Sequence, residues 1–187
     1  MRSLGWLLAA SALCPAHSLA AQKAPLVIGK GRLGPIALCS KLDTVNKVFR
    51  HVKDTVFTGE VSTRWRAKLV NVGDGRLTFA SSWSDSSHIW SMGSTSTHVR
   101  TPRGYRVGMT FGDLIAAREP MTLHLPEGSL VINLDSEGVG VAVDEESERR
   151  FYDRYQDYHN PPRPDMVPDS ARVTEISVSG GCPKASR

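Results

Sequence analysis

The stretch Gly104-Tyr-Arg-Val-Gly-Met-Thr110 has an earlier counterpart in the chain, Gly34-Pro-Ile-Ala-Leu-Cys-Ser40. In both copies a glycine comes six residues before a hydroxyl residue, and an aspartate, Asp43 or Asp113, follows that hydroxyl by three. A hydroxyl residue with a carboxylate in the next turn is typical of a helix start, so we expect Ser40 and Thr110 to cap helices. The repetition predicts that one short unit of structure occurs twice.

The sequence after each copy predicts the same order of elements. A short helix follows the cap, and two apolar runs separated by a Gly-rich turn then predict an antiparallel hairpin. We therefore predict an α+β fold of two tandem strand-helix-hairpin units, 34–101 and 102–187, whose helices pack on one face of an antiparallel sheet. Both units would form one compact domain. Residues 22–33 read as an extended leader, and the polar residues 50–63 as a loop or short second helix.

The second unit carries an insert, residues 144–169, that the first lacks. Its first part predicts a charged helix, and its Pro-rich second part an extended crossing. Phe151, Tyr155 and Tyr158 recur at helical spacing, so one face of this helix is aromatic. Such a stripe most often packs on the protein's own sheet, but an added segment is also where a partner-binding surface is gained.

The N-terminus has the pattern of a secretory signal peptide covering residues 1–21. A positive charge precedes the apolar run 6–13, and small residues predict cleavage near Ala20 or Ala21. Leu13, rather than a small residue, precedes Cys14, which disfavours a lipoprotein signal. The apolar run is shorter than the about 20 residues that span a bilayer, so we expect no transmembrane segment and a periplasmic or secreted product.

The charge balance and the cysteine content narrow the functional class of the protein further. The formal net charge is +4, and without residues 1–21 the chain has 22 basic and 19 acidic residues, too small an excess to favour nucleic acid. Cys39 and Cys182 then remain, and in an oxidising compartment they predict one disulfide. Two free thiols, or pairing between chains, are the alternatives. The spacing of Cys and His suggests no metal site and no cofactor.

The Ser/Thr-rich region 81–101 contains the residue types of a hydrolase or a zinc site. Neither a nucleophile elbow nor a zinc-ligand spacing is present, so a water-facing strand is the favoured interpretation. The residues concerned are Asp85, Ser87, His88, Ser94 and His98.

Two tryptophans, Trp83 and Trp90, flank the predicted turn Asp85-Ser86-Ser87. Cross-strand or core packing is the favoured interpretation for them and for Trp65. If they are exposed instead, they are the residue type that anchors protein interfaces.

The phrase from Ser94 to Thr110, with its Arg-Thr-Pro-Arg-Gly-Tyr-Arg-Val-Gly-Met-Thr end, resembles a family of exported bacterial proteins that are mostly uncharacterised. The cap and the element order also resemble the β-lactamase inhibitor proteins and the small lipoproteins of the β-barrel assembly machine. The resemblance to the inhibitors implies two tandem helix-on-sheet units. The chain departs from these groups in its first copy, where Leu-Cys-Ser replaces Gly-Met-Thr, and in its insert.

These observations favour a non-enzymatic exported protein that binds another envelope or extracellular protein, in an inhibitor-like or similar role. Its candidate contact residues are Trp83, Trp90, Phe151, Tyr155 and Tyr158. A periplasmic hydrolase that uses Ser and His of region 81–101 is the alternative, and a carrier of a small apolar ligand between helices and sheet is a second one.

Overall fold

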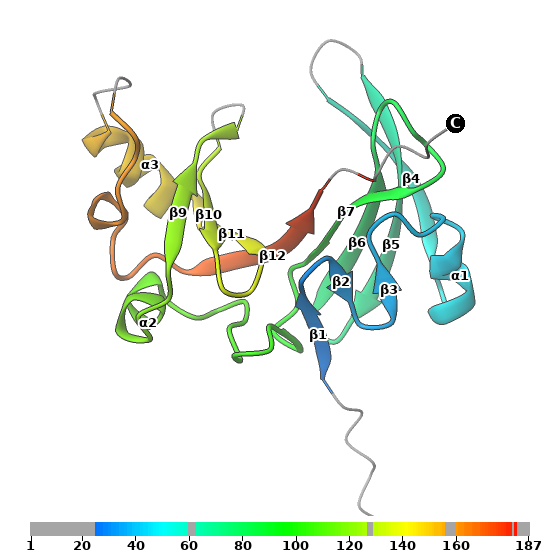
Figure 1. Cartoon of the computed structure of the whole chain (residues 1–187), viewed down its shortest axis with the longest axis horizontal. Coiled ribbons are helices and arrows are strands. Elements are labelled where there is room, and N and C mark those ends of the chain that lie inside the picture. Colours follow the sequence, from blue (N-terminus) through cyan, green and yellow to red (C-terminus); the bar gives the residue numbers. More distant parts are fainter. Residues whose placement is uncertain (1–24, 60–62, 127–128, 156–159, 181, 183–187) are drawn as a thin grey trace, which may run out of the picture.

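The computed structural model describes residues 25–59, 63–126, 129–155, 160–180 and 182. In this part the chain is mainly β, with twelve strands in a four-stranded and an eight-stranded sheet and three short α-helices (Figure 1). The predicted signal peptide, residues 1–21, lies outside the described residues. Within them, no helix combines the length and apolar character needed to cross a membrane.

The eight-stranded sheet is formed by two antiparallel meanders in the order β4-β5-β6-β7-β12-β11-β10-β9. They join where β12 pairs with β7, with Ile176 opposite Ser94 and Ser177 opposite Gly93. The first meander contains β4 (Lys53–Thr58), β5 (Arg64–Val72), β6 (Gly75–Ser81) and β7 (Ile89–Ser94). The second contains β9 (Met121–His124), β10 (Val131–Leu134), β11 (Val139–Val143) and β12 (Val173–Ser179).

The small sheet and the helices are short elements between these strands. The small sheet has the order β3-β2-β1-β8 and consists of β1 (Leu26–Gly29), β2 (Arg32–Leu33), β3 (Ile36–Ala37) and β8 (Val99–Arg100). The helices are α1 (Thr44–Val48), α2 (Phe111–Ala116), α3 (Glu145–Arg154) and the 3₁₀-helix η3 (Pro164–Met166).

The predicted α+β fold of helices packed on a sheet is therefore wrong. The two helices that follow the repeated stretches have five and six residues, too few to form a layer of their own. Strands occupy segments for which none was predicted: β1 and β2 lie in the expected leader, β4 in the expected loop 50–63, and β9 directly after Pro120. In β4 the residues Thr55, Val56 and Phe57 have strong β propensity, and the charged residues around them mask it.

Both halves nevertheless place a short helix before an antiparallel meander, and in the second half α3 and η3 interrupt that meander before β12. The Gly-rich turns predicted within the two hairpins lie at Gly73-Asp-Gly75 and Ser136-Glu-Gly138, and they connect neighbouring strands, β5 to β6 and β10 to β11. That the two halves arose by duplication of one unit stays a prediction.

The two copies of the repeated stretch differ in how they end. Thr110 caps α2, and its Oγ accepts a hydrogen bond from the Asp113 amide while the Asp113 carboxylate accepts one from the Thr110 amide. Ser40 does not cap α1, because the cap position falls on Asp43, which makes no side-chain cap hydrogen bond. Backbone bonds of Cys39 and Ser40 to Ile89 of β7 hold the first copy instead.

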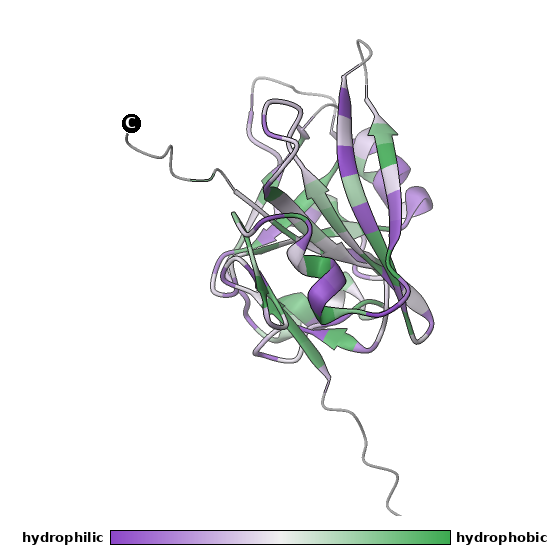
Figure 2. Cartoon of the chain, turned by 90° about the vertical axis from the view of Figure 1, so that its right-hand side faces the viewer, coloured by the Kyte–Doolittle hydropathy of each residue, from purple (hydrophilic) through white to green (hydrophobic). Residues whose placement is uncertain are grey.

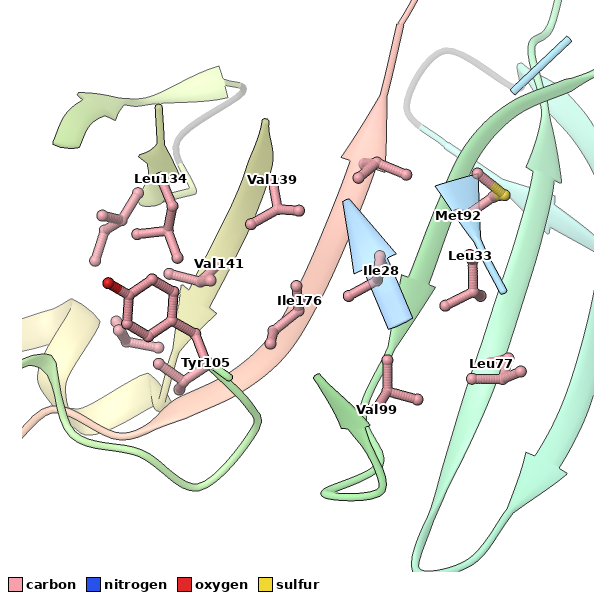
Figure 3. Packing of buried hydrophobic residues seen from close by; sticks show 14 of the residues in the cluster. Ile28, Leu33, Leu77, Met92, Val99, Tyr105, Leu134, Val139, Val141 and Ile176 are labelled. Carbon is pink, nitrogen blue, oxygen red and sulfur yellow. The ribbon is translucent and has the colours of Figure 1, made fainter. Parts of the chain in front are cut away.

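The hydrophobic core lies on one face of the large sheet. The small sheet and all three helices contribute to it through buried residues such as Ile28, Leu33, Val45, Phe111 and Phe151. Figure 3 shows Ile28 and Leu33 near Leu77, Met92 and Ile176 of the large sheet. Figure 2 shows hydrophilic and hydrophobic residues alternating along the strands of the sheet edge, the period of a half-buried strand.

Candidate functional site

The opposite face of the large sheet, here called the outer face, carries the residues that alternate with the core positions. One row of cross-strand partners crosses all eight strands on this face. From β4 to β9 it contains Lys53, Leu69, Thr78, Gly93, Ser177, Gly140, Asn133 and Thr122. Beyond Leu69 the row has only small or short polar side chains, so it forms a low, polar floor.

A basic hollow of about 190 Å³ lies at the β4–β6 end of the outer face. Its lining is His51, Lys53, Leu69, Asn71 and Arg76. Asn71 is the direct cross-strand partner of Arg76, and Leu69 that of Lys53. Basic side chains from β4 and β6 thus flank an amide and an apolar side chain on β5, the strand between them. His51 has a φ of 56°, a left-handed conformation that is rare outside glycine and is frequent at functional sites.

A second hollow of about 270 Å³ lies at the β10–β12 end, lined among others by Asn133, Asp135, Gly140 and Ser179. Between the two hollows, the Glu175 carboxylate lies over Gly93, since a Cβ added to Gly93 would be 2.5 Å from Glu175 Oε1. Burial raises the pKa of Glu175, and the nearby charge of Arg76 opposes this rise. The outer face is therefore basic at one end and acidic in its middle.

Residues 82–90, here called the tryptophan turn, comprise the β6–β7 connection and the first two residues of β7. They expose the two largest apolar side chains of this region. Trp83 is 75 % exposed and Trp90 is 42 % exposed. The favoured sequence interpretation, packing, does not describe either side chain. Trp65, by contrast, is half-buried and pairs with Phe57 across the β4–β5 hairpin, with ring centroids 6.3 Å apart.

A network of short polar contacts fixes the conformation of the tryptophan turn. The Asp85 amide donates to Ser82 Oγ at 2.9 Å, and Asp85 Oδ1 accepts from the Ser87 amide and hydroxyl at 2.9 and 2.6 Å. Asp85 Oδ2 lies 2.7 Å from His88 Nδ1. These bonds, those of Ser87 above all, hold the pKa of Asp85 well below its usual range.

The turn is also fastened to the segment before α1. The Leu42 amide donates to the Ser87 carbonyl at 2.8 Å, and the Cys39 amide donates to the Ile89 carbonyl at the same distance. The predicted disulfide between Cys39 and Cys182 is present, with Cα atoms 5.3 Å apart. The tryptophans are thus presented by a turn that is hydrogen-bonded to a disulfide-linked segment, which limits the freedom that the turn has to lose on binding.

Asp85, Ser87 and His88 lie together, but not in the arrangement of a catalytic triad. Ser87 Oγ lies 3.0 Å from His88 Nδ1, the same ring nitrogen that Asp85 contacts. In a triad the nucleophile and the carboxylate contact opposite ring nitrogens, so that a proton passes through the ring. The contacts present here are those of a hydrogen-bonded turn.

The other polar residues of region 81–101 have structural positions. Ser94 is buried and accepts a bond from the Ser96 amide, and the His98 ring lies over Gly73. Ser96 and Thr97 hydrogen-bond to Asp74, which lowers the Asp74 pKa to about 2. No group of three potential metal ligands occurs in the described part of the chain.

The aromatic residues of the insert are part of the core. Phe151 is fully buried and stacks on Tyr155, which is also buried. Their side chains are therefore not available to a partner in this structure. Tyr158 lies outside the described residues. The sequence reasoning missed the basic hollow, because its residues come from three segments that only the strand register brings together.

The chain has a mainly β fold. A small sheet with parallel and antiparallel strand pairs, together with short helices, covers one face of the large antiparallel sheet. No family model matches the sequence, and neither does any curated protein. Among solved structures, the chain is similar to the uncharacterized protein yfeY from Escherichia coli, with a TM-score of 0.59 and 12% sequence identity. The match covers 82% of this chain and 99% of that chain. This likeness shows a shared fold.

Proposed function

We propose that this chain is an exported, non-enzymatic protein that binds another protein of the bacterial envelope or its surroundings through the tryptophan turn. The observation that carries the proposal is the exposure of Trp83 and Trp90 on a turn that hydrogen bonds fasten to the disulfide-linked segment. Tryptophan is the residue type most enriched among the anchors of protein interfaces. A protein that only needed a stable turn would gain nothing from leaving two indole rings in water.

The polar groups around the rings fit the same role. Ser84, Ser86 and Ser87 are exposed beside the two tryptophans, and interfaces commonly surround an apolar centre with a polar rim. Such a surface recognises an apolar side chain of a partner at its centre and backbone polar groups at its edge.

The test compares Trp83→Ala/Trp90→Ala with the matched control Ile115→Ala, which removes a similarly exposed apolar side chain from α2. The full chain would be expressed in the bacterium, cross-linked, and its partners identified by mass spectrometry. Affinity for a purified partner should fall about thirtyfold in the tryptophan variant and remain unchanged in the control. Equal partner recovery with all three proteins would refute the role of the turn.

A deletion of the insert is not a usable test, since Phe151 and Tyr155 belong to the core. Their removal would destabilise the fold whether or not the insert contacts a partner.

A further inference from the structure

The basic hollow contains cationic side chains that have no counter-charge at hydrogen-bond distance within the described part of the chain. Among the described residues, Lys53 and Arg76 form no ion pair and no side-chain hydrogen bond. Lys68, on the other face of the sheet, is ion-paired instead. Its Nζ lies 2.6 Å from the carboxylate of Asp54 and 3.5 Å from that of Asp43. The buried lysine is thus ion-paired, whereas no carboxylate of the described residues lies within ion-pair distance of Lys53 or Arg76, although Arg76 interacts with the charge of Glu175.

The register explains how these side chains reach a common point. Arg76 lies on β6 and Lys53 on β4, one on each side of Asn71 and Leu69 on β5. Neighbouring strands are about 4.8 Å apart, so the two backbones are separated by about 10 Å, a span that two long side chains close easily. The side-chain amide of Asn71, on the strand between them, can donate a hydrogen bond to a ligand in the hollow. The His51 ring completes the lining.

The charge of the surrounding half favours an anion. Residues 25–101 contain eleven Lys and Arg against five Asp and Glu, whereas residues 102–187 contain ten against fourteen. The small excess of the whole chain thus conceals a positive first half and a negative second half. A hollow with basic walls in the positive half concentrates anions from solution.

We infer that the basic hollow binds a phosphate group, held by Arg76, Lys53, His51 and the Asn71 amide. A phosphate offers three or more acceptor oxygens to these donors, whereas a carboxylate offers only two. The volume of about 190 Å³ is smaller than the roughly 300–1,000 Å³ of pockets for drug-sized ligands, so it suits a single headgroup. Leu69 supplies an apolar contact for the carbon adjoining the phosphate.

The inference does not depend on the tryptophan turn, and different variants test it. Binding of inorganic phosphate and of glycerol phosphate to the purified mature chain would be followed by NMR titration. Binding to phosphatidylcholine vesicles would be compared with and without about one-fifth phosphatidic acid. The first two probes report a free phosphate ligand and the vesicles a lipid headgroup.

Arg76→Gln and Lys53→Gln should each weaken binding at least about tenfold, because each removes a charged donor. Lys47→Gln makes the same charge change on exposed α1 and should alter affinity less than about twofold. Glu175→Gln removes a carboxylate whose charge interacts with Arg76 and should strengthen binding. Thermal unfolding would confirm that all four variants fold.

Three outcomes would overturn the inference. The first is that no probe shows saturable binding at any concentration up to about tens of millimolar. The second is an equal loss with Lys47→Gln and Arg76→Gln, which would indicate diffuse attraction rather than a site. The third is saturable binding of an oligoglutamate peptide, dependent on Arg76, in the absence of any phosphate binding.

Discussion

At the scale of single residues, Lys68 shows how an ionisable group is accommodated beneath α1. Its side chain is 2% exposed, whereas its partners Asp54 and Asp43 remain 66% and 73% exposed. The ammonium group therefore depends on two carboxylates that themselves lie in water. Asp43, predicted as a capping residue, contributes through this ion pair and not through a cap.

This asymmetry predicts unequal effects of removing the two sides of the ion pair. Lys68→Met leaves two solvated carboxylates and should change the free energy of unfolding by less than about 1 kcal/mol. Asp43→Asn/Asp54→Asn leaves a buried ammonium group without a counter-charge and should cost about 3–5 kcal/mol. Urea unfolding of both variants would measure the difference. Equal losses in the two variants would contradict the predicted asymmetry.

Glu175 gives a prediction with a defined pH window. Burial raises its pKa above the ordinary value of 4.5, so the folded chain retains a proton that the unfolded chain releases. The free energy of unfolding must then fall as pH rises from about 4.5 through the folded-state pKa. Glu175→Gln removes the ionisation and should be more stable than the parent at neutral pH but not at about pH 4. Thermal unfolding at both pH values checks this, and a gain of equal size at both would contradict it.

At the scale of elements, the repeated stretches illustrate what the pattern could and could not predict. The cap at Thr110 depends on neighbours within one turn, so local sequence was sufficient to predict it. At Ser40 the pattern is the same, but the conformation is set by bonds to β7. Those bonds join residues that are far apart in sequence, and no local pattern encodes them.

Parallel substitutions distinguish the cap at Thr110 from the uncapped copy at Ser40. Thr110→Ala removes the bond to the Asp113 amide and should lower the free energy of unfolding by about 1 kcal/mol. Ser40→Ala removes a hydroxyl that makes no hydrogen bond to the described residues and should cost less than about 0.5 kcal/mol. Chemical denaturation of the two variants is sufficient. A loss at Ser40 as large as that at Thr110 would mean that the first copy is also a cap in solution.

The strands, too, divide into those that the local sequence predicted and those that it did not. Apolar runs predicted the strands of the two hairpins, β5, β6, β10 and β11, since each packs one face on the core. The edge strand β4 was missed because Lys53, Asp54 and Thr58 are exposed and make the segment look like a loop. The basic hollow was missed with it, since its geometry requires β4 to lie beside β5. Trp83 and Trp90 were identified as candidates, but their exposure depends on how the turn folds.

At the scale of the whole molecule, the two halves are joined by more than the β7–β12 pairing. The Glu119 side chain, fully buried, accepts bonds from Arg103, Tyr105 and Ser136 and so ties the connection between the halves to the β10–β11 turn. The main chain of that turn also accepts a bond from Lys30, which directly follows β1. Contacts of this kind make the two halves one structural unit.

The Cys39–Cys182 disulfide makes the longest covalent connection in this unit, across 143 residues. In the chain-entropy model a loop of this length is worth up to about 5 kcal/mol, through restriction of the unfolded chain. Cys39→Ser/Cys182→Ser should therefore lower the thermal midpoint markedly, and reduction of the parent should lower it to the same value. Calorimetry under oxidising and reducing conditions measures both changes. Because the bridge holds the segment to which the tryptophan turn is hydrogen-bonded, the variant should bind the proposed partner more weakly even at temperatures where it is fully folded. Undiminished binding would show that the backbone bonds to Ile89 hold the turn without the bridge, and an unchanged midpoint would refute its stabilising role.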